Sequence, residues 1–441
     1  MKTIRRKLQS EQGTILFVTL IATAIIGAAL ASYLRLVANQ NYSVARSQAW
    51  NRAMPVLEAG LEEAMAQINK SASAASLVAN GWVLTGTNYV KQTAFDGEYA
   101  NVKIALLAFP ILESQGFTKV PLGNGDMVSR RVRATTKRTS PFTKAMAADG
   151  QIDLLGNNVT ADSFDSSNVL YSVGGLYHPS IRRANGDIAT NGQLLNGGNA
   201  DVYGHVATGP GGTSNFGSNG AVGDLAWHAA GNSGIQPGAA ADDMNVEFPP
   251  VPVPYTLGLP PIAGAVGGTN YAYVLSGTGA KYSMSSLSLS GSGSIKKILV
   301  TGDVSLHVTG NVSLSGQAGF IIAPGARLRM YVGTLSGPPV SASLGGSGVV
   351  NGTGNAANFS YSGLPSNTSI SFSGNAAFVG TIYAPSAALH LGGGGSTTYD
   401  FVGASVSKTV QMNGHFNFHY DENLGKATSD GYYVVTSWNE L

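Results

Sequence analysis

The longest apolar run of the chain lies near its N-terminus. Between Thr14 and Leu34, 21 successive residues carry no charge. A helix of that length is about 31 Å long, enough to cross a hydrocarbon core about 30 Å thick. Basic residues precede the run, and such positive segments stay on the cytoplasmic side. The pattern therefore predicts a membrane helix over 14–34 that directs the rest of the chain out of the cytoplasm.

A helical pattern continues beyond the apolar run. One face carries the apolar side chains, and the other carries acidic ones. The apolar set is Leu57, Leu61, Ala64, Met65 and Ile68, and the acidic set is Glu58, Glu62 and Glu63. The pattern predicts one helix over 14–70, kinked at Pro55, after a basic leader over 1–13. A cleaved secretory signal and an ordinary uncleaved anchor are the alternatives.

Residues 71–147 have a mixed pattern that predicts a small α+β head. Met127 to Thr136 alternates apolar and polar side chains, as a strand of an antiparallel sheet does. This region holds a basic cluster made of Arg130, Arg131, Arg133, Lys137, Arg138 and Lys144. The cluster is either a solvated strand edge, where charge blocks further pairing, or a patch for nucleic acid or lipid headgroups.

From about Ala148 onward, short apolar runs alternate with Gly, Asn, Ser and Thr, and short motifs recur. The letters FVG at 378–380 recur at 401–403, IAT at 188–190 recurs as VAT at 206–208, and APGARL at 323–328 recurs as APSAAL at 384–389. Intervals of 18 and 23 residues suit one coil of a three-sided β-solenoid, and 61 suits three coils. The expected fold is α+β and mainly β: a long N-terminal helix, a small head and an irregular right-handed β-solenoid. A β-sandwich is the alternative.

A proline-rich segment divides the β-rich part. Residues 248–261 hold six of the 18 prolines, so this segment is extended and a poor donor to a sheet. We interpret 248–262 as a linker or strap between a first β-rich part over 148–247 and a second over 263–441.

Composition and charge exclude several classes of protein. The chain has 441 residues, 58 glycines, 11% charged residues and no cysteine, so thiolate zinc sites, iron–sulfur clusters and cysteine nucleophiles are excluded. A hydrophobic content of 43% is too high for a disordered chain. Residues 1–13 carry four basic side chains against Glu11, and the remainder carries 22 basic against 23 acidic. This near-neutral remainder gives no general attraction to nucleic acid, which is not an expected partner.

Motifs for catalysis or cofactor binding are missing from the sequence, which contains no P-loop, nucleophile elbow or metalloprotease motif. Carboxylates that could stack along one groove of a β-helix enzyme are Asp162, Asp165, Asp187, Asp201 and Asp224, although such residues more often cap turns. His415 and His419 share a strand face with Asn417, but about 13 Å separates them, too far for one metal ion. We expect no enzyme activity, catalytic residue, cofactor or metal site.

The N-terminal segment resembles a type IV prepilin. The resemblance rests on the basic leader, the letters EQG at 11–13, and TILFV at 14–18; LEAGLE at 57–62 resembles the end of the helix in PilX-type domains. It implies that prepilin peptidase cuts between Gly13 and Thr14. It also implies that the helix packs in a filament core, through side chains that include Phe17, Val18, Leu20 and Ile21. Major pilins carry glutamate where this chain has Val18, which favours a minor subunit.

The C-terminal part resembles an uncharacterised domain of bacterial pilus-assembly-like proteins with PilX N-termini. The residues that carry this resemblance are FVGTIYAP at 378–385, FVGA at 401–404 and GHFNFHYDE at 414–422. It implies a cell-envelope location and no reaction.

The expected function is a structural component of a type IV pilus-like or type II secretion-like filament, a minor, tip or assembly subunit. Expected partners are the inner membrane, prepilin peptidase, other pilin or pseudopilin subunits and surface glycans. The helix would lie in the bacterial inner membrane, with the β-rich body periplasmic or extracellular. One alternative is a membrane-anchored adhesin that binds glycans through exposed aromatics such as Trp227 and Tyr361. A polysaccharide-active β-helix enzyme is the second alternative.

Overall fold

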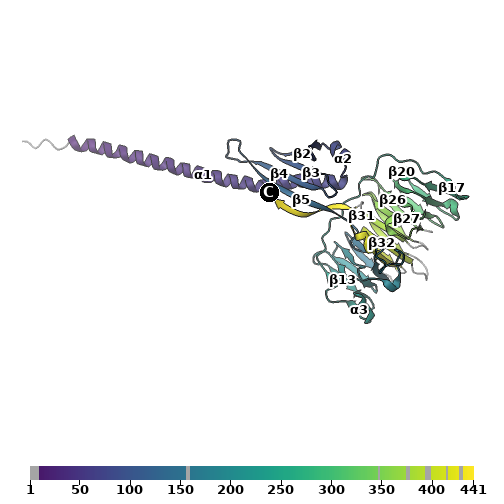
Figure 1. Cartoon of the computed structure of the whole chain (residues 1–441). Helices are drawn as coiled ribbons and strands as arrows, with labels where there is room; N and C mark the ends of the chain where they lie inside the picture. The colour runs from purple at the N-terminus through teal and green to yellow at the C-terminus, as the bar shows by residue number, and fades with distance from the viewer. Residues whose placement is uncertain are drawn as a thin grey trace, which may run out of the picture. The chain divides into compact units, whose positions relative to one another are not determined.

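The computed structural model describes residues 9–154, 159–345, 348–373, 378–392, 399–413, 416–426 and 431–441. The protein is mainly β, with one long helix and a few short ones (Figure 1). It has two compact units. Unit 1 runs to Arg138 and also contains Tyr433–Leu441, and unit 2 is Thr139–Tyr432.

Helix α1, Gln9–Lys70, has two chemically different parts. Over 15–36 every side chain is exposed, and this part forms the one stretch of the described chain that is long and apolar enough to cross a membrane. From Ala45 onward, buried positions recur every three or four residues, and they include Leu57, Leu61 and Ile68 as predicted. The helix runs through the exposed Pro55 without interruption.

Unit 1 packs the second part of α1 against a six-stranded sheet. The strand order is β1-β2-β3-β4-β5-β34. The bounds are β1 Val83–Thr85, β2 Asn88–Phe95, β3 Glu98–Ala105, β4 Ile111–Lys119, β5 Met127–Thr139 and β34 Tyr432–Glu440, with a short helix α2 at Ala74–Ala79. Strands β1 to β5 pair antiparallel in chain order. The C-terminal strand β34 belongs to this sheet, which differs from the expected assignment of 263–441 to the second β-rich part.

Small residues let α1 approach the sheet closely. A Cβ atom built on Gly60 of α1 would lie 2.7 Å from Val102 Cγ2 and 2.8 Å from Ser114 Oγ, and one on Gly116 of β4 would lie 2.5 Å from the backbone oxygen of Ala53. Any larger side chain at either glycine would force the helix away from the sheet. Gly60, which lies in the LEAGLE motif, therefore has a packing role.

We expect Ser114→Ala to leave the stability of unit 1 unchanged or to raise it by about 1 kcal/mol. The Ser114 hydroxyl is fully buried against the helix and has no hydrogen-bond partner among the described residues, and a buried unpaired hydroxyl costs about 1–3 kcal/mol. Chemical denaturation of the full chain in detergent measures the difference. Ser129→Ala is the matched control, because that hydroxyl accepts a hydrogen bond from Gln115; a loss of stability in Ser114→Ala would contradict the prediction.

Unit 2 consists of many short strands. Its first part contains β6 Met146–Ala148, β7 Ile152–Leu154, β8 Thr160–Phe164, β9 Ile188–Thr190, β10 Leu194–Gly198, β11 Asp201–Tyr203, β12 Val206–Ala207, β13 Thr213–Phe216, β14 Ala221–Gly223, helix α3 Leu225–Ala229, β15 Gly234–Ile235 and β16 Ala240–Ala241. Its second part begins with β17 Gly264–Val266, β18 Thr269–Tyr271, β19 Tyr273–Leu275, β20 Thr278–Met284, β21 Leu287–Leu289, β22 Lys297–Val300, β23 Asp303–Val308 and β24 Val312–Leu314. It continues with β25 Gly319–Ile322, β26 Arg327–Val332, β27 Val340–Leu344, β28 Gly348–Asn351, β29 Phe359–Gly363, β30 Asn367–Phe372, β31 Phe378–Gly392, β32 Tyr399–Asn413 and β33 Phe416–Asp421.

The strands of unit 2 pair in parallel ladders. From β19 to β27, each strand pairs with the strand three places later in the chain. The hairpin of β17 and β18 is antiparallel and separate from these ladders. Parallel pairing at this regular interval stacks successive turns of the chain on one another.

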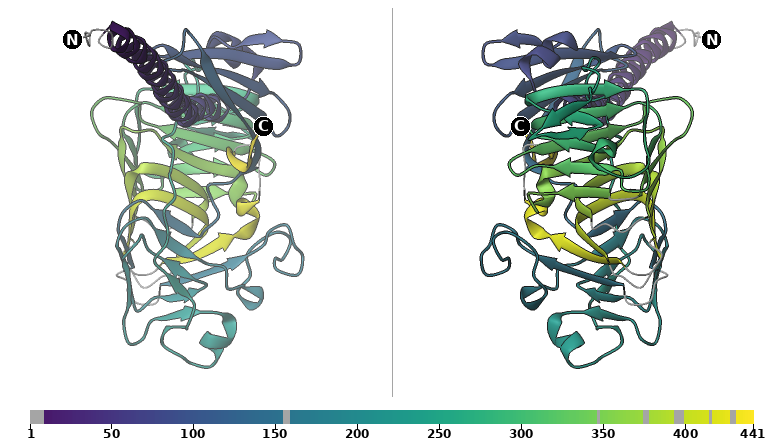
Figure 2. Two further views of the ribbon diagram at one scale, coloured as in Figure 1. Left: turned by 90° about the vertical axis from the view of Figure 1, so that its left-hand side faces the viewer. Right: turned by 90° about the vertical axis from the view of Figure 1, so that its right-hand side faces the viewer.

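The two β-rich parts of unit 2 form one continuous stack. Strand β32 pairs with β31 on one side and with β6 and β7 on the other, and β33 pairs with β8. The last strands of the second part therefore lie against the first strands of the first part. Figure 2 shows this order along unit 2, with the yellow strands between the green and the blue ones.

The proline-rich segment lies along the outside of this stack as a strap. The Tyr383 hydroxyl donates to the Pro249 carbonyl at 2.7 Å, and the Tyr255 hydroxyl donates to the Tyr282 carbonyl at 2.6 Å. Leu259 pairs with β20 through two backbone hydrogen bonds. The segment is thus fixed to unit 2 at several points along its length.

Two of the sequence repeats correspond to single steps of a ladder. Phe378 pairs in register with Phe401, and Ile188 pairs with Val206. The phenylalanine rings form a stack in the core. The ring centroid of Phe401 lies 4.5 Å from that of Phe378 and 4.3 Å from that of Phe418. The third repeat was misinterpreted as three coils, because Leu328 and Leu389 lie on different ladders: Leu328 pairs with Phe359, and Leu389 pairs with Ile370.

Candidate functional site

The first part of α1 offers an exposed apolar surface. Phe17, Val18, Leu20 and Ile21 are between 41% and 64% exposed, and the residues around them are exposed as well. Gly13 and Thr14 lie within the helix, ahead of this surface. A helix with apolar side chains all round is stable only in lipid or among other apolar helices, so this surface can enter a bilayer or a bundle of helices.

A second candidate is a buried polar cluster in unit 2, centred on His419. Its Nδ1 lies 2.6 Å from Asp162 Oδ1, and its Nε2 lies 3.3 Å from Asp400 Oδ1. The Tyr177 ring stacks on the imidazole at 3.7 Å between centroids, and its hydroxyl donates to Asp162 at 2.8 Å. Arg182 lies 3.7 Å from the same carboxylate. His419 and Asp162 are almost completely buried.

The two carboxylates determine the charge of His419. Burial by itself lowers the pKa of this histidine, but the hydrogen bonds and charges of Asp162 and Asp400 outweigh burial and raise its pKa above 6.5. The hydrogen bond from His419 lowers the pKa of Asp400 in turn. The cluster therefore favours the protonated imidazole between two carboxylates, and it joins β33, β8 and β32. The Tyr177 ring covers the imidazole, and Asp400 stays about half exposed. The cluster is therefore an ionic clamp between strands.

The other predicted carboxylates do not meet at one groove. Asp165 pairs with Lys426 at 3.0 Å, and Asp187 pairs with Lys144 at 2.8 Å. Asp224 caps α3 by accepting a hydrogen bond from the Trp227 backbone at 2.7 Å. Asp201 lies 4.0 Å from His228. These are the pairing and turn-capping roles that aspartate takes in turns and helix ends.

Several other predicted positions have defined surroundings. In the basic cluster, Arg130 pairs with Glu440 at 2.7 Å and Arg133 with Glu113 at 2.6 Å. Trp227 is half-buried. The prediction of Tyr361 as an exposed aromatic was wrong, because its side chain is fully buried and its hydroxyl donates to Asn367 at 2.9 Å. His415 lies outside the described residues.

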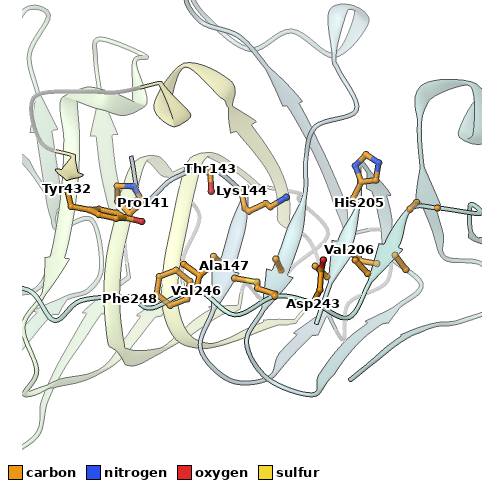
Figure 3. Close-up of a pocket in the computed structure, with 17 residues that line it drawn as sticks. Pro141, Thr143, Lys144, Ala147, His205, Val206, Asp243, Val246, Phe248 and Tyr432 are labelled. Carbon is orange, nitrogen blue, oxygen red and sulfur yellow. The ribbon is translucent and has the colours of Figure 1, made fainter. Parts of the chain in front are cut away.

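Unit 2 also contains an elongated cavity of about 350 Å³. Its floor is a row of alanines on successive strands, namely Ala147, Ala189, Ala207 and Ala241. Figure 3 shows Lys144 and His205 on one side and Asp243, Val246 and Phe248 along the other. Because the small alanine side chains leave the floor open and polar side chains line the edges, the cavity can take a narrow ligand with an apolar face and polar groups at its rim. Sequence analysis missed this cavity, since only the register brings these alanines together.

The chain is similar to one family model and to a solved structure. A family model described as a domain of unknown function (DUF7305) matches residues 275–427, about a third of the chain. No curated protein matches. Among solved structures, the competence-associated pilin ComZ from Thermus thermophilus is similar at 10% identity and a TM-score of 0.25, over 88% of this chain and 97% of that chain. Such a low score does not establish a shared fold, so any function must be argued from this chain's own residues.

Proposed function

We propose that the protein is a structural subunit of a type IV pilus-like or type II secretion-like filament, in a minor, tip or assembly role. The observation that carries this proposal is the division of α1. Its apolar first part has no covering residues in the described chain, whereas its second part is fixed to a sheet through Gly60 and Gly116. This combination presents a bare apolar helix on a folded head, which is what a helical filament core or a membrane anchor needs.

In this proposal α1 first anchors the subunit in the membrane and then packs in the filament. The basic leader keeps the N-terminus cytoplasmic while 14–34 spans the inner membrane, and prepilin peptidase cuts between Gly13 and Thr14. The same apolar side chains, among them Phe17, Val18, Leu20 and Ile21, then pack against the helices of neighbouring subunits. Val18 supplies no carboxylate to neutralise a neighbour's N-terminal amine, which favours a minor subunit. The rest of the chain is periplasmic or extracellular.

The proposal includes a β-solenoid as the projecting body. The parallel pairing of each strand with the strand three places later supports this interpretation, since the strands of an immunoglobulin-like sandwich pair antiparallel. The stacked phenylalanines and the continuity between the two β-rich parts support it as well. A stack of this kind is stiff along its axis, which suits a projection from an envelope filament.

We expect the mature protein to begin at Thr14 in cells with an active prepilin peptidase and at Met1 in cells without one. Mass spectrometry of N-terminal peptides from envelope fractions measures this. Gly13→Val should block the cut, whereas Gly27→Val should not. An intact Met1 in both strains would leave a plain membrane anchor, and cleavage near residue 31 would indicate a secreted protein; either result would contradict the proposal.

The cavity of unit 2 supports a second candidate, a membrane-anchored adhesin. Its polar side chains, Lys144, His205 and Asp243, line an otherwise apolar trough, and surface glycans are the partner class to test. A glycan array would favour the adhesin if discrete binding were lost on substitution. Loss in Ala189→Leu, which fills the floor, would assign the contact to the cavity, and loss in Trp227→Ala would assign it to the predicted aromatic outside the cavity. The buried Tyr361 cannot serve as a contact.

A further inference from the structure

Charge is distributed unequally between the two ends of unit 2. Residues 184–247 contain six acidic residues and no lysine or arginine, whereas residues 248–302 contain three lysines and no acidic residue. The acidic residues are Asp187, Asp201, Asp224, Asp242, Asp243 and Glu247, and the lysines are Lys281, Lys296 and Lys297. All residues in both ranges are described by the structure.

Part of each set lies at an end of the parallel stack. Asp224 caps α3, and Asp242 and Asp243 follow β16, whereas Lys281 lies in β20 and Lys296 lies on a turn that contacts β18. Asp187 lies away from the ends, where it pairs with Lys144. Figures 1 and 2 show α3 and the β17–β20 region at opposite ends of unit 2 in every view. We call the end at α3, β13, β15 and β16 the acidic end and the end at β17 to β21 the basic end.

Both ends present strand edges that further chain could contact. At the acidic end, β13 pairs with β10, β15 with β14 and β16 with β12. At the basic end, β19, β20 and β21 pair with β22, β23 and β24. The strap and the β17–β18 hairpin partly cover the basic end, through Leu259 on β20 and Ile262 on β19.

The basic end also exposes large apolar side chains. Leu257 is 85% exposed and Ile262 is 68% exposed. The other exposed apolar residues of this end are Leu259, Val266 and Ile295. Lys296 adjoins Ile295 on a short helical turn that contacts β18, so positive charge borders this apolar patch. At the acidic end, exposed Leu225 lies beside Asp224.

We propose that unit 2 of one copy binds end to end with unit 2 of another copy, the basic end of the first against the acidic end of the second. The charges of the two ends are opposite, and both belong to the same chain, so the complementary partner is a second copy. The exposed apolar side chains of the basic end are covered in this contact. Because the two surfaces differ, the contact is heterologous and repeats without closing, so copies form rows. This inference does not depend on the proposed filament role of α1.

The test uses the full chain in phosphatidylcholine nanodiscs, one copy per disc, so that α1 helices cannot associate. We expect sedimentation velocity to show association that rises with protein concentration and weakens between 50 and 500 mM NaCl. Each of two variants reverses the charge of one end. The basic-end variant carries Lys281→Glu, Lys296→Glu and Lys297→Glu, and the acidic-end variant carries Asp242→Lys and Asp243→Lys. Each variant alone should associate on the order of tenfold more weakly, since its two ends now carry like charge.

Mixing the two variants distinguishes the proposed contact from a loss of folding. The basic-end variant keeps the native acidic end, and the acidic-end variant keeps the native basic end, so the mixture should at least form pairs of one copy of each variant. Lys103→Glu, Lys119→Glu and Lys137→Glu in unit 1 form the control for net charge and should leave association unchanged. Failure of the mixture to associate would overturn the proposal, as would an equal loss in the control.

Anionic lipid is the competing occupant of the basic end, because lysines beside exposed apolar side chains also suit a charged bilayer. The same nanodisc-held chain is therefore tested against phosphatidylglycerol vesicles. A chain that stays monomeric at every concentration and captures these vesicles, with capture lost in the basic-end variant, would overturn self-association and assign the basic end to lipid. A chain that stays monomeric and captures no vesicles would overturn it too.

Discussion

Gly60→Val is expected to lower the free energy of unfolding of unit 1 by about 3 kcal/mol or more. The first added atom would lie 2.7 Å from Val102 Cγ2, 2.8 Å from Ser114 Oγ and 2.9 Å from Ala100 Cβ, all closer than atoms can pack. Valine is a better helix former than glycine, so any loss comes from packing. Relief requires α1 to move away from β3 and β4, which uncovers Leu57, Leu61 and the rest of the buried helix face.

Hydrogen exchange of peptides from β3, β4 and the second part of α1 measures this effect in the full chain. The matched control is Gly27→Val, because Gly27 lies in the same helix and a Cβ there would meet no atom within 4 Å. Protection of β3 and β4 should fall in Gly60→Val and stay unchanged in Gly27→Val. Equal protection in the two variants would show that the helix does not rest on the sheet at Gly60.

Asp162→Ala is expected to cost unit 2 about 3–5 kcal/mol, because it removes the closest counter-charge of a buried imidazolium. In the variant, the remaining carboxylate partner of His419 is Asp400, which is partly solvent-exposed and lies 3.3 Å from Nε2. The Tyr177 hydroxyl also loses its acceptor. Thermal unfolding of the full chain measures the loss. Asp153→Ala is the control, since Asp153 lies on neighbouring β7 and its carboxylate accepts from the exposed Gln151. A loss no larger than that of the control would contradict the clamp.

The clamp also predicts a dependence on pH. Because the folded-state pKa of His419 lies above its usual 6.5, its contribution to stability is complete below about pH 6.5 and is lost as pH rises through the raised value. The lowered pKa of Asp400 acts at the other extreme, with a contribution that is present above about pH 4 and lost as pH falls. The unfolding temperature of unit 2 should therefore fall from pH 6 towards alkaline pH, and this fall should be smaller in His419→Gln. Identical profiles in the two proteins would contradict the assignment.

Sequence analysis predicts the elements whose signals are local. The buried face of α1 repeats every three or four residues, and the FVG repeat identifies two residues, Phe378 and Phe401, that stack in the core. The polar cluster has no such signal, because His419 and Asp162 are 257 positions apart and Tyr177 reaches them from a covering segment. The sequence also does not indicate which sheet β34 joins, since a short run of Tyr, Val and Thr can form a strand in either unit. Alternation shows that a segment is a strand, but the partner depends on the rest of the chain.

The position of β32 and β33 in the middle of unit 2 has a consequence for how the chain folds. The first strands of the unit, β6 to β8, obtain one set of neighbours only when residues near 420 have arrived. Contacts between such distant segments are slow to form, so two half-built stacks coexist until the last segment enters between them. During that interval each stack exposes strand edges that attract other chains. The protein should therefore depend on a chaperone while it folds, and a chain that ends before β32 should aggregate.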